Sequence, residues 1–215
     1  MKAMIYTKYG SPDVLQLADV EKPTPKADEL LVKVAATAVN PADNHILSGT
    51  LRFSTGLLKP RGQILGSDIA GWVEAVGRNV KEFQPGDELF GDLSAYGRGG
   101  FAEYVAVPEV ALVRKPANVT FAEAAAVPMT AVTALQGLRD KGRLRPGQRV
   151  LINGASGGVG TFAVQIARVL GGEVTAVVST RKTEMVRAIG ADHVIDYTQE
   201  DFSQTGQRYD LIFYT

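Results

Sequence analysis

The sequence predicts an α/β protein in two parts, a partly open β-barrel or sandwich followed by a doubly wound parallel sheet. Three observations in the 215 residues support this prediction. Short apolar runs separated by glycine and proline fill roughly the first 115 residues, which is typical of all-β domains. From residue 149 onward, apolar runs alternate with helical patterns, as in βαβ units. A glycine-rich segment lies between the first of these runs and its helix.

Short strands are expected throughout the first part. Residues 30–39 are rich in β-branched and aliphatic side chains, and Leu30, Val32 and Val34 occupy every second position. A Pro-Gly-Asp turn at 85–87 introduces another run. The expected strands are residues 14–20, 30–39, 70–76, 88–91, 101–107 and 111–114.

The pattern changes near residue 116. Alanine- and leucine-rich residues predict helices at 121–126 and 130–141. We place the domain boundary near residue 120, which gives domains 1–120 and 121–215. The second domain is expected to contain strands 149–153, 173–178, 193–196 and 210–214, with helices 159–170 and 181–189 between them.

Composition excludes several classes of protein. The chain has no cysteine, which removes disulfide scaffolds, thiol catalysis and zinc sites built on thiolates. Its 23 basic and 23 acidic residues balance, which argues against a nucleic-acid-binding protein. The longest uncharged stretch, 150–167, contains glycines and polar residues, unlike the ~20 apolar residues of a membrane span. The first ten residues lack the apolar run of a secretory signal, so a cytoplasmic protein is expected.

The glycine-rich segment predicts a bound dinucleotide. The pattern Ala155-x-Gly157-x-x-Gly160 is a dinucleotide fingerprint with alanine at its first position, and it lies between a strand and a helix, as the fingerprint requires. Glycines let the backbone approach a pyrophosphate, whose charge meets the N–H groups at the helix N-terminus. The alternative is a tight turn without a ligand. The predicted binding residues are Gly154, Ala155, Ser156, Gly157, Gly158, Val159 and Gly160.

The end of the next strand predicts which dinucleotide binds. An NAD site needs an acid about 20 residues beyond the glycines to hold the ribose 2′-hydroxyl. This chain has Ser179, Thr180, Arg181 and Lys182 there. The dipole of the predicted helix disfavours two cations at its start, and a 2′-phosphate would pair with them. The sequence therefore predicts NADP(H), bound by these four residues; the alternative is that both cations are solvated surface residues.

Seven segments, in this order and spacing, resemble the medium-chain dehydrogenase/reductases, specifically their zinc-independent NADPH:quinone oxidoreductase-like branch. The resemblance covers essentially the whole chain. It implies a GroES-like catalytic domain followed by a Rossmann domain, an active site in the cleft between them, and a homodimer. The segments are VNPADNHILSG (39–49), ILGSDIAGWVEAVG (64–77), QPGDELFGDL (84–93), GGFAEYVAVP (99–108), AAAVPMTAVTALQGL (124–138), INGASGGVGTFAVQIA (152–167) and GADHVIDY (190–197).

Departures from the zinc-using members of the family predict a site without metal. The zinc alcohol dehydrogenases have a thiolate where this chain has Asn40, and a histidine where it has Ser67. Without cysteine, these positions cannot assemble a tetrahedral zinc site. An enzyme without this Lewis acid needs a substrate that accepts hydride readily, such as a quinone or an enone.

The resemblance also implies roles for single residues. Asn40 and Thr133 are expected near the nicotinamide, and Tyr197 near the adenosine phosphate with Lys182. His45 falls where quinone reductase relatives often have a tyrosine, so it could donate a hydrogen bond to the substrate oxygen; the alternative is a histidine on the helix surface or in packing. Asn40 and His45 are the candidate catalytic residues.

Two other residues are expected to have structural roles: Asp43 as an acid near a helix N-terminus, favoured by the dipole, and His193 at the start of a strand.

Three functions stay open at this point. The first is an NADPH-dependent quinone or enone reductase, or a piece of one. The nucleotide-binding sheet of the family has six strands and four are expected here, so we expect an N-terminal fragment. The second is a dinucleotide-binding protein without catalysis. The third is an enoyl reductase module that acts on acyl thioesters.

Overall fold

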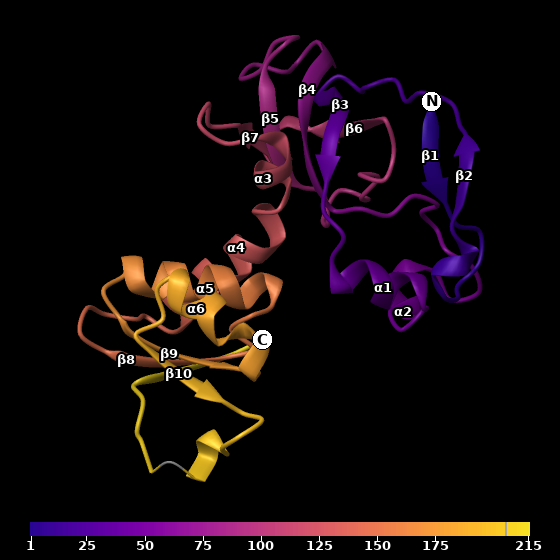
Figure 1. The fold of residues 1–215 in the computed structure, drawn as a ribbon. Helices are drawn as coiled ribbons and strands as arrows, with labels where there is room; N and C mark the ends of the chain where they lie inside the picture. Colours follow the sequence, from indigo (N-terminus) through magenta and orange to yellow (C-terminus); the bar gives the residue numbers. More distant parts are fainter. Residues whose placement is uncertain (205) are drawn as a thin grey trace. The chain divides into compact units, whose positions relative to one another are not determined.

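The described residues, 1–204 and 206–215 of a computed structural model, form two units with different secondary structure (Figure 1). Unit 1 is Met1–Met129 and unit 2 is Thr130–Thr215. The predicted boundary near residue 120 lies ahead of helix α3 (Phe121–Ala125), whereas this division follows Met129. The α3 residues Ala124 and Ala125 pack against Ala70 of the unit 1 sheet, which is why α3 groups with unit 1.

Unit 1 contains a five-stranded antiparallel sheet and a two-stranded one. The larger sheet has the order β6-β3-β4-β5-β7, and β1 pairs with β2. Six of these strands confirm the expected ones with ends shifted by a few residues, and β1 was not expected. The bounds are β1 Lys2–Ile5, β2 Gln16–Asp19, β3 Glu29–Thr37, β4 Asp68–Val76, β5 Glu88–Asp92, β6 Tyr104–Pro108 and β7 Leu112–Arg114.

The core of unit 1 follows from the period-2 pattern of its strands. The strands of the larger sheet contribute side chains to one buried hydrophobic cluster, which includes Leu30, Val32, Ile69 and Val107. Two short helices, α1 (Pro41–Leu47) and α2 (Arg52–Thr55), lie between β3 and β4 in the chain. Ile46 of α1 packs with other buried side chains in a second cluster, so α1 is fixed against the unit.

Unit 2 is a four-stranded parallel sheet with helices. Its strands are β8 (Arg149–Asn153), β9 (Glu173–Val178), β10 (His193–Asp196) and β11 (Leu211–Tyr214). Their order is β10-β9-β8-β11, which is 3-2-1-4 in chain order and matches the first four strands of a doubly wound sheet. The predicted architecture, a β domain followed by a doubly wound parallel sheet, is therefore confirmed.

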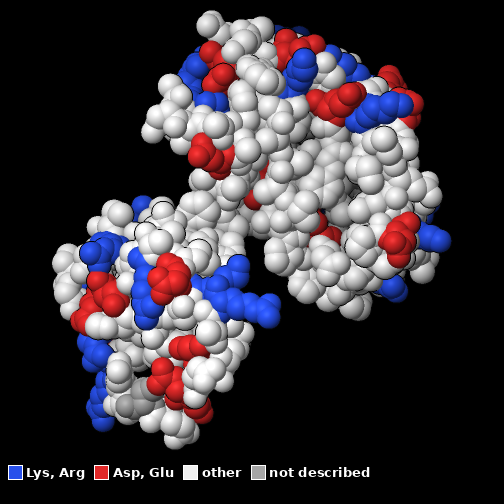
Figure 2. Space-filling model, viewed as in Figure 1, with Lys and Arg blue, Asp and Glu red and all other residues white. Residues whose placement is uncertain are grey.

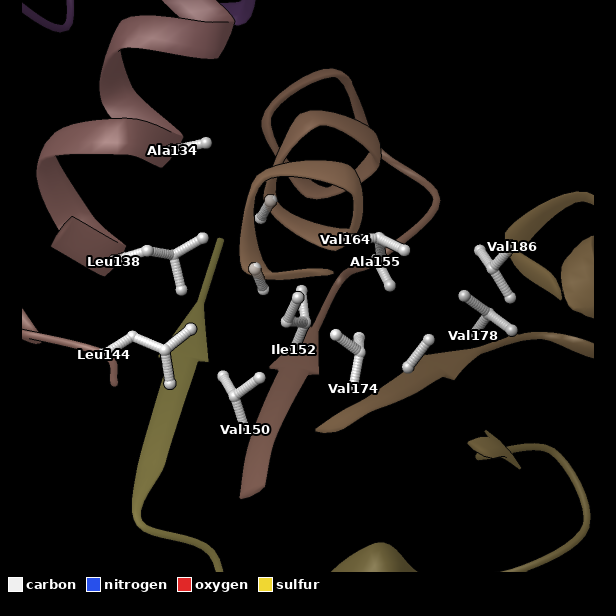
Figure 3. Close-up of a cluster of buried hydrophobic side chains, with 13 residues drawn as sticks. Ala134, Leu138, Leu144, Val150, Ile152, Ala155, Val164, Val174, Val178 and Val186 are labelled. Carbon is white, nitrogen blue, oxygen red and sulfur yellow. The ribbon is translucent and has the colours of Figure 1, made fainter. Parts of the chain in front are cut away.

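Helix α5 (Gly158–Val169) covers the sheet through its apolar stripe. Figure 3 shows Ala155 and Val164 above the strand side chains Val150, Ile152 and Val174. All five are fully buried or nearly so. At about 25 cal/mol per Å² of buried apolar surface, each buried valine or isoleucine stabilises the unit by about 1.5–3 kcal/mol. This packing fixes the start of α5 against the end of β8.

Two expected helices differ in detail. Helix α4 spans Pro128–Leu135, and Gln136–Lys141 continue as a π-helix in which Gly142 N–H donates to the Gly137 carbonyl at 2.8 Å. Gly137 weakens the α-helical preference of the segment expected at 130–141. The helix expected at 181–189 is a 3₁₀ turn, Thr180–Lys182, followed by α6 (Thr183–Ala188).

The remaining short turns are 3₁₀ helices at Pro12–Val14, Glu109–Ala111 and Phe202–Gln204. Within residues 1–204 and 206–215, none of the helices has the length and apolar character needed to cross a bilayer.

Candidate functional site

The glycine-rich loop lies at the carboxyl end of β8, next to β11. Strand order reverses between these two strands, since β9 and β10 extend to one side of β8 and β11 to the other. Ligands of doubly wound sheets bind at this position, outside the carboxyl ends of the strands. The hydroxyl of Thr215, directly after β11, donates to the Asn153 carbonyl at 3.1 Å and ties the two strand ends together. The predicted loop is therefore at the expected crevice.

Two glycines of the loop are required by its conformation. Gly154 has φ of 79°, a left-handed conformation that side chains with a Cβ rarely adopt. A Cβ on Gly160 would come within 2.1 Å of the Gly154 carbonyl oxygen. Gly160 therefore lets the first turn of α5 pack closely on the loop, the role of the third glycine of the fingerprint.

The start of α5 presents backbone N–H groups to solvent. Gly157 is the N-cap and has no side chain to cap the helix, and Gly157 and Gly158 are both exposed. Among the described residues, no acceptor is present for the N–H groups of Gly158 and Val159. A Cβ on Gly157 would meet only the Gly154 oxygen, at 3.4 Å, so the space beside it is open. These features fit a pyrophosphate.

The segment after β9 lies at the same edge of the sheet. The amide of Ala155 donates to the Val177 carbonyl at 3.3 Å, which joins the loop to the end of β9. Ser179 is the N-cap of the 3₁₀ turn, and Arg181 and Lys182 are exposed. Within the described part of the chain, neither cation forms an ion pair. The two cations are thus available to an anionic ligand.

An acidic side chain does lie near this segment, but it comes from β10 and not from the end of β9. Asp196, at the end of β10, accepts the hydroxyl of Thr180, and this hydrogen bond is the main cause that lowers its pKa. Thr198 donates its N–H to the same carboxylate at 2.9 Å. Because the Thr180 hydroxyl donates its hydrogen bond to Asp196, the Thr180 oxygen keeps its lone pairs to accept another one. Asp196 was not predicted from the sequence, because the acid of an NAD site is expected at the end of β9 and Asp196 comes from β10.

Tyr197 and Thr133 are also placed in unit 2. Tyr197 follows β10 with its ring exposed, and its N–H donates to the Val178 carbonyl at 3.1 Å, beside Ser179. Thr133 is an exposed residue of α4. One turn earlier, Thr130 lies against the start of α5, where its methyl group would be 3.2 Å from a Cβ on Gly158. The loop, the end of β9 and Tyr197 are therefore brought to one edge, with α4 beside the loop.

Unit 1 contains a buried polar cluster around Asn40. Its side-chain NH₂ donates to a carboxylate oxygen of Asp68 at 2.9 Å, and the other oxygen of Asp68 accepts the Met129 N–H at 3.0 Å. Asn40 is 5% exposed and Asp68 is 0% exposed. Since an ionised carboxylate only accepts, it fixes the Asn40 amide with its NH₂ toward Asp68.

Burial changes the acid–base behaviour of Asp68. Loss of hydration is the largest cause and raises the pKa of this carboxyl to about 6, while the hydrogen bonds from Asn40 and Met129 oppose the shift. Asp68 was not among the predicted site residues. The sequence does contain a feature that points to it: Asp68 directly precedes the apolar strand residue Ile69, which places a carboxylate at the edge of the core. A charged group is rare in a protein core unless it is paired or hydrogen-bonded.

The start of α1 places the other predicted residues. Asp43, buried in the first turn of α1, accepts the Asn40 N–H at 2.8 Å and the Gly66 N–H at 3.2 Å, so the prediction of a helix N-terminal acid is confirmed. His45 is exposed on α1, and Ser67 is buried with its carbonyl bonded to Leu93. No group of three or more potential metal-ligating side chains occurs among the described residues.

His193 and the surface charges lie outside these clusters. His193 is exposed and its Nε2 lies 2.7 Å from a carboxylate oxygen of Glu173, on the neighbouring strand. On the face in Figure 2, positive and negative side chains are interspersed over each unit. The predicted site residues therefore fall into two groups, Asn40 and His45 in unit 1 and all the others in unit 2.

Family comparisons match both units. The profile described as "Alcohol dehydrogenase GroES-like domain" matches residues 26–117, and the profile described as "Zinc-binding dehydrogenase" matches residues 158–213.

Curated relatives are similar over nearly the whole chain. A 2-methylene-furan-3-one reductase of Solanum lycopersicum is 39% identical, and the NADPH-dependent alkenal/one oxidoreductase of Arabidopsis thaliana chloroplasts is 38% identical. Each alignment covers 99% of this chain but 56% of the relative. The chloroplast envelope quinone oxidoreductase homolog of Arabidopsis thaliana is 38% identical, with 99% of this chain and 67% of that protein covered. The chain thus spans between about half and two thirds of these relatives.

Solved structures of reductases are also similar to this chain. The quinone oxidoreductase of Coxiella burnetii has a TM-score of 0.87 and 30% identity, with 99% of this chain and 67% of that one covered. The Escherichia coli quinone oxidoreductase complexed with NADPH has a TM-score of 0.83 and 30% identity, covering 94% and 60%. The CurK enoyl reductase has a TM-score of 0.87 and 32% identity, covering 98% and 66%. The chain belongs to the medium-chain dehydrogenase/reductase superfamily, in its quinone-oxidoreductase-like branch.

Proposed function

We propose that this protein is an NADPH-dependent oxidoreductase that transfers hydride to a quinone or an α,β-unsaturated carbonyl without zinc. The observation that supports it most is the dinucleotide loop at the strand-order reversal of unit 2, with Arg181 and Lys182 in the 3₁₀ turn after the adjacent strand, where neither forms an ion pair with a described residue. The names of relatives agree, since they include an NADPH-dependent alkenal/one oxidoreductase and a quinone oxidoreductase solved with NADPH.

The residues of unit 2 fit the adenosine and pyrophosphate parts of NADPH. The exposed N–H groups at Gly158 and Val159 would bind the pyrophosphate at the start of α5. Arg181 and Lys182 would pair with the 2′-phosphate, and the oxygen of Thr180, whose hydroxyl donates to Asp196, would accept a hydrogen bond from a ribose hydroxyl. Bound NADPH supplies the hydride.

Unit 1 contributes polar side chains without a zinc site. Asp68 fixes the Asn40 amide so that its oxygen can accept a hydrogen bond, which suits the proposed position near the nicotinamide carboxamide. The exposed imidazole of His45 would donate to the substrate oxygen as negative charge develops there. Ser67 and Asn40 replace the zinc ligands of other family members, and the chain has no cysteine, so the acceptor must be activated by its own conjugation.

The cofactor proposal is tested by binding of NADPH and NADH to the 215-residue chain. The R181A/K182A variant should bind NADPH about 10–100-fold more weakly, because it loses charge-assisted hydrogen bonds worth about 1.5–3 kcal/mol, and NADH about as well as before. R187A is the matched control, since Arg187 is a cation of the same unit already paired with Glu184. Equal loss for both dinucleotides, or none, contradicts the assignment of the 2′-phosphate.

An enoyl reductase that acts on acyl thioesters is the second candidate, favoured by the likeness to the CurK enoyl reductase. The two functions differ in the substrate that supports oxidation of NADPH. The protein at its natural length should be assayed with quinones, enones and enoyl thioesters. Turnover confined to thioesters supports the second candidate. NADPH binding without turnover of any of these would show a binding protein instead.

The homodimer and the cytoplasmic location stay predictions. The dimer depends on the family resemblance, and sedimentation velocity of the natural-length protein tests it. The location is tested by fractionation, since some relatives are named as chloroplast proteins.

A further inference from the structure

A small cavity in unit 1 contains two arginines without carboxylate partners. It has a volume of about 280 Å³, and its walls include Arg61, Arg98 and Tyr6, together with aliphatic side chains of Ile46, Ile64 and Leu65. Arg61 and Arg98 also line an adjoining cavity of about 500 Å³ whose wall includes Glu21. Neither arginine is in an ion pair with Glu21 or with any other described residue.

The guanidinium of Arg98 has a hydrogen-bond donor that is unsatisfied. Its Nε is buried and has no hydrogen-bond partner, which among the described side chains is true of no other buried nitrogen or oxygen. A buried charged donor without an acceptor is destabilising, because it has lost water and gained nothing in return. The missing partner is therefore an acceptor that carries negative charge.

The backbone of Arg98 is also unusual. Its φ is 67°, and the two glycines on either side of it have positive φ as well. A residue with a Cβ rarely adopts this conformation, and such strain is concentrated at functional sites. The N–H of Arg98 donates to the Leu93 carbonyl at 3.1 Å, which holds the loop in place.

Tyr6 adds a neutral donor to the same cavity. Its side chain is only 3% exposed, and its hydroxyl makes no hydrogen bond to the part of the chain that the structure describes. Burial is the main cause that raises the pKa of Tyr6, so the phenol keeps its proton. The nearby carboxylate of Asp43, which acts on Tyr6 electrostatically, is already bonded to Asn40 and Gly66.

We propose that this cavity binds the carboxylate of a short aliphatic acid. The planar guanidinium of Arg98 suits two parallel hydrogen bonds to one carboxylate, with Arg61 beside it and the Tyr6 hydroxyl as a further donor. The aliphatic walls suit a short carbon chain, which inorganic phosphate lacks. The proposal depends on unit 1 alone and is independent of the dinucleotide site.

The test follows the Arg98 Nε–H signal by NMR in the 215-residue chain while hexanoate is added at constant ionic strength. The signal should move downfield and saturate, whereas inorganic phosphate should cause no saturable shift. R98Q should weaken hexanoate binding roughly tenfold or more, and Y6F several-fold. R143Q is the matched control, because Arg143 is the other described residue with a side chain at positive φ.

Each outcome decides the proposal. Absence of a saturable shift, or equal affinity in wild type, R98Q and Y6F, overturns it. Preference for phosphate overturns the carboxylate assignment, and an equal loss in R143Q shows a nonspecific effect of charge. If R98Q does not fold, Y6F and the wild-type signal decide, because Y6F removes only the hydroxyl.

Discussion

Asp68 is fully buried, and its carboxylate is hydrogen-bonded to the starts of two helices. Its two oxygens accept from Asn40, the N-cap of α1, and from Met129, in the first turn of α4. The hydrogen bonds compensate only part of the lost hydration, so the pKa of the carboxyl is raised to about 6. A residue of this kind makes the stability of unit 1 depend on pH.

The first prediction concerns that dependence. The folded carboxyl of Asp68 keeps its proton up to about pH 6, whereas the unfolded one releases it near 3.8. Through this group the folded state binds more protons between these values, so the contribution of Asp68 to the free energy of unfolding decreases as pH rises from about 4 to about 6. The change from this group is at most about 3 kcal/mol, at about 1.4 kcal/mol for each unit of pKa. D68N should remove this contribution, so that the stability of unit 1 changes with pH in a more positive direction than in wild type, although the substitution lowers the stability itself by weakening the two hydrogen bonds.

Trp72 makes the measurement specific for unit 1, since it is the one tryptophan of the chain and lies in β4 with Asp68. Urea unfolding followed by its fluorescence at several pH values gives the slope. E200Q, a change at an exposed residue of unit 2, should leave the slope as in wild type. An unchanged slope in D68N would show that Asp68 does not bind a proton in this range.

At the scale of elements, α3 depends on its N-terminal capping box. Glu123 N–H donates to the Thr120 hydroxyl at 3.2 Å, and the Glu123 carboxylate accepts the Thr120 N–H at 2.8 Å. T120A should lower the free energy of unfolding of unit 1 by about 1 kcal/mol. Trp72 fluorescence reports it directly, because Phe121 of α3 lies 4.4 Å from the Trp72 ring. T24A, at an exposed threonine outside any element, should have no effect, and an equal loss there would contradict the capping assignment.

The glycine loop allows binding and folding to be separated. G157A adds a Cβ that would meet only the Gly154 oxygen, at 3.4 Å, so unit 2 should keep its stability while NADPH binds at least roughly tenfold more weakly, because the methyl group occupies the approach of the pyrophosphate. G160A places a Cβ 2.1 Å from the Gly154 oxygen, so it should destabilise unit 2 as well. Calorimetric binding and thermal unfolding of both variants give the comparison. Full NADPH affinity in G157A would exclude the proposed pyrophosphate position.

The elements also show what a single sequence can predict. The β8–loop–α5 unit was predicted because its pattern is local: a strand, a fingerprint and an apolar stripe follow one another. Strand β1 was not, since four residues give little periodicity and its pairing partner, β2, is more than ten residues away. Asp68, Asp196 and the Arg98 cavity were missed for the same reason. Their meaning comes from residues brought together by the fold, such as Asn40 with Asp68 across 28 positions.

At the scale of the whole molecule, the two units should respond differently to an adenosine ligand. Adenosine 2′,5′-bisphosphate contains the 2′-phosphate proposed to bind Arg181 and Lys182, and both cations are in unit 2. At 100 times its Kd, a ligand that binds only the folded state stabilises it by about 2.7 kcal/mol.

Hydrogen exchange can measure each unit in the same sample, because peptides from β8 and α5 report unit 2 and those from β3 and β4 report unit 1. The bisphosphate should slow exchange in unit 2 peptides and leave the Trp72 unfolding curve of unit 1 unchanged. AMP, which lacks the 2′-phosphate, should protect unit 2 less, and R181A/K182A should remove the difference between the two nucleotides. Protection of unit 1 alone would place the nucleotide elsewhere and refute the site proposed at the end of β9.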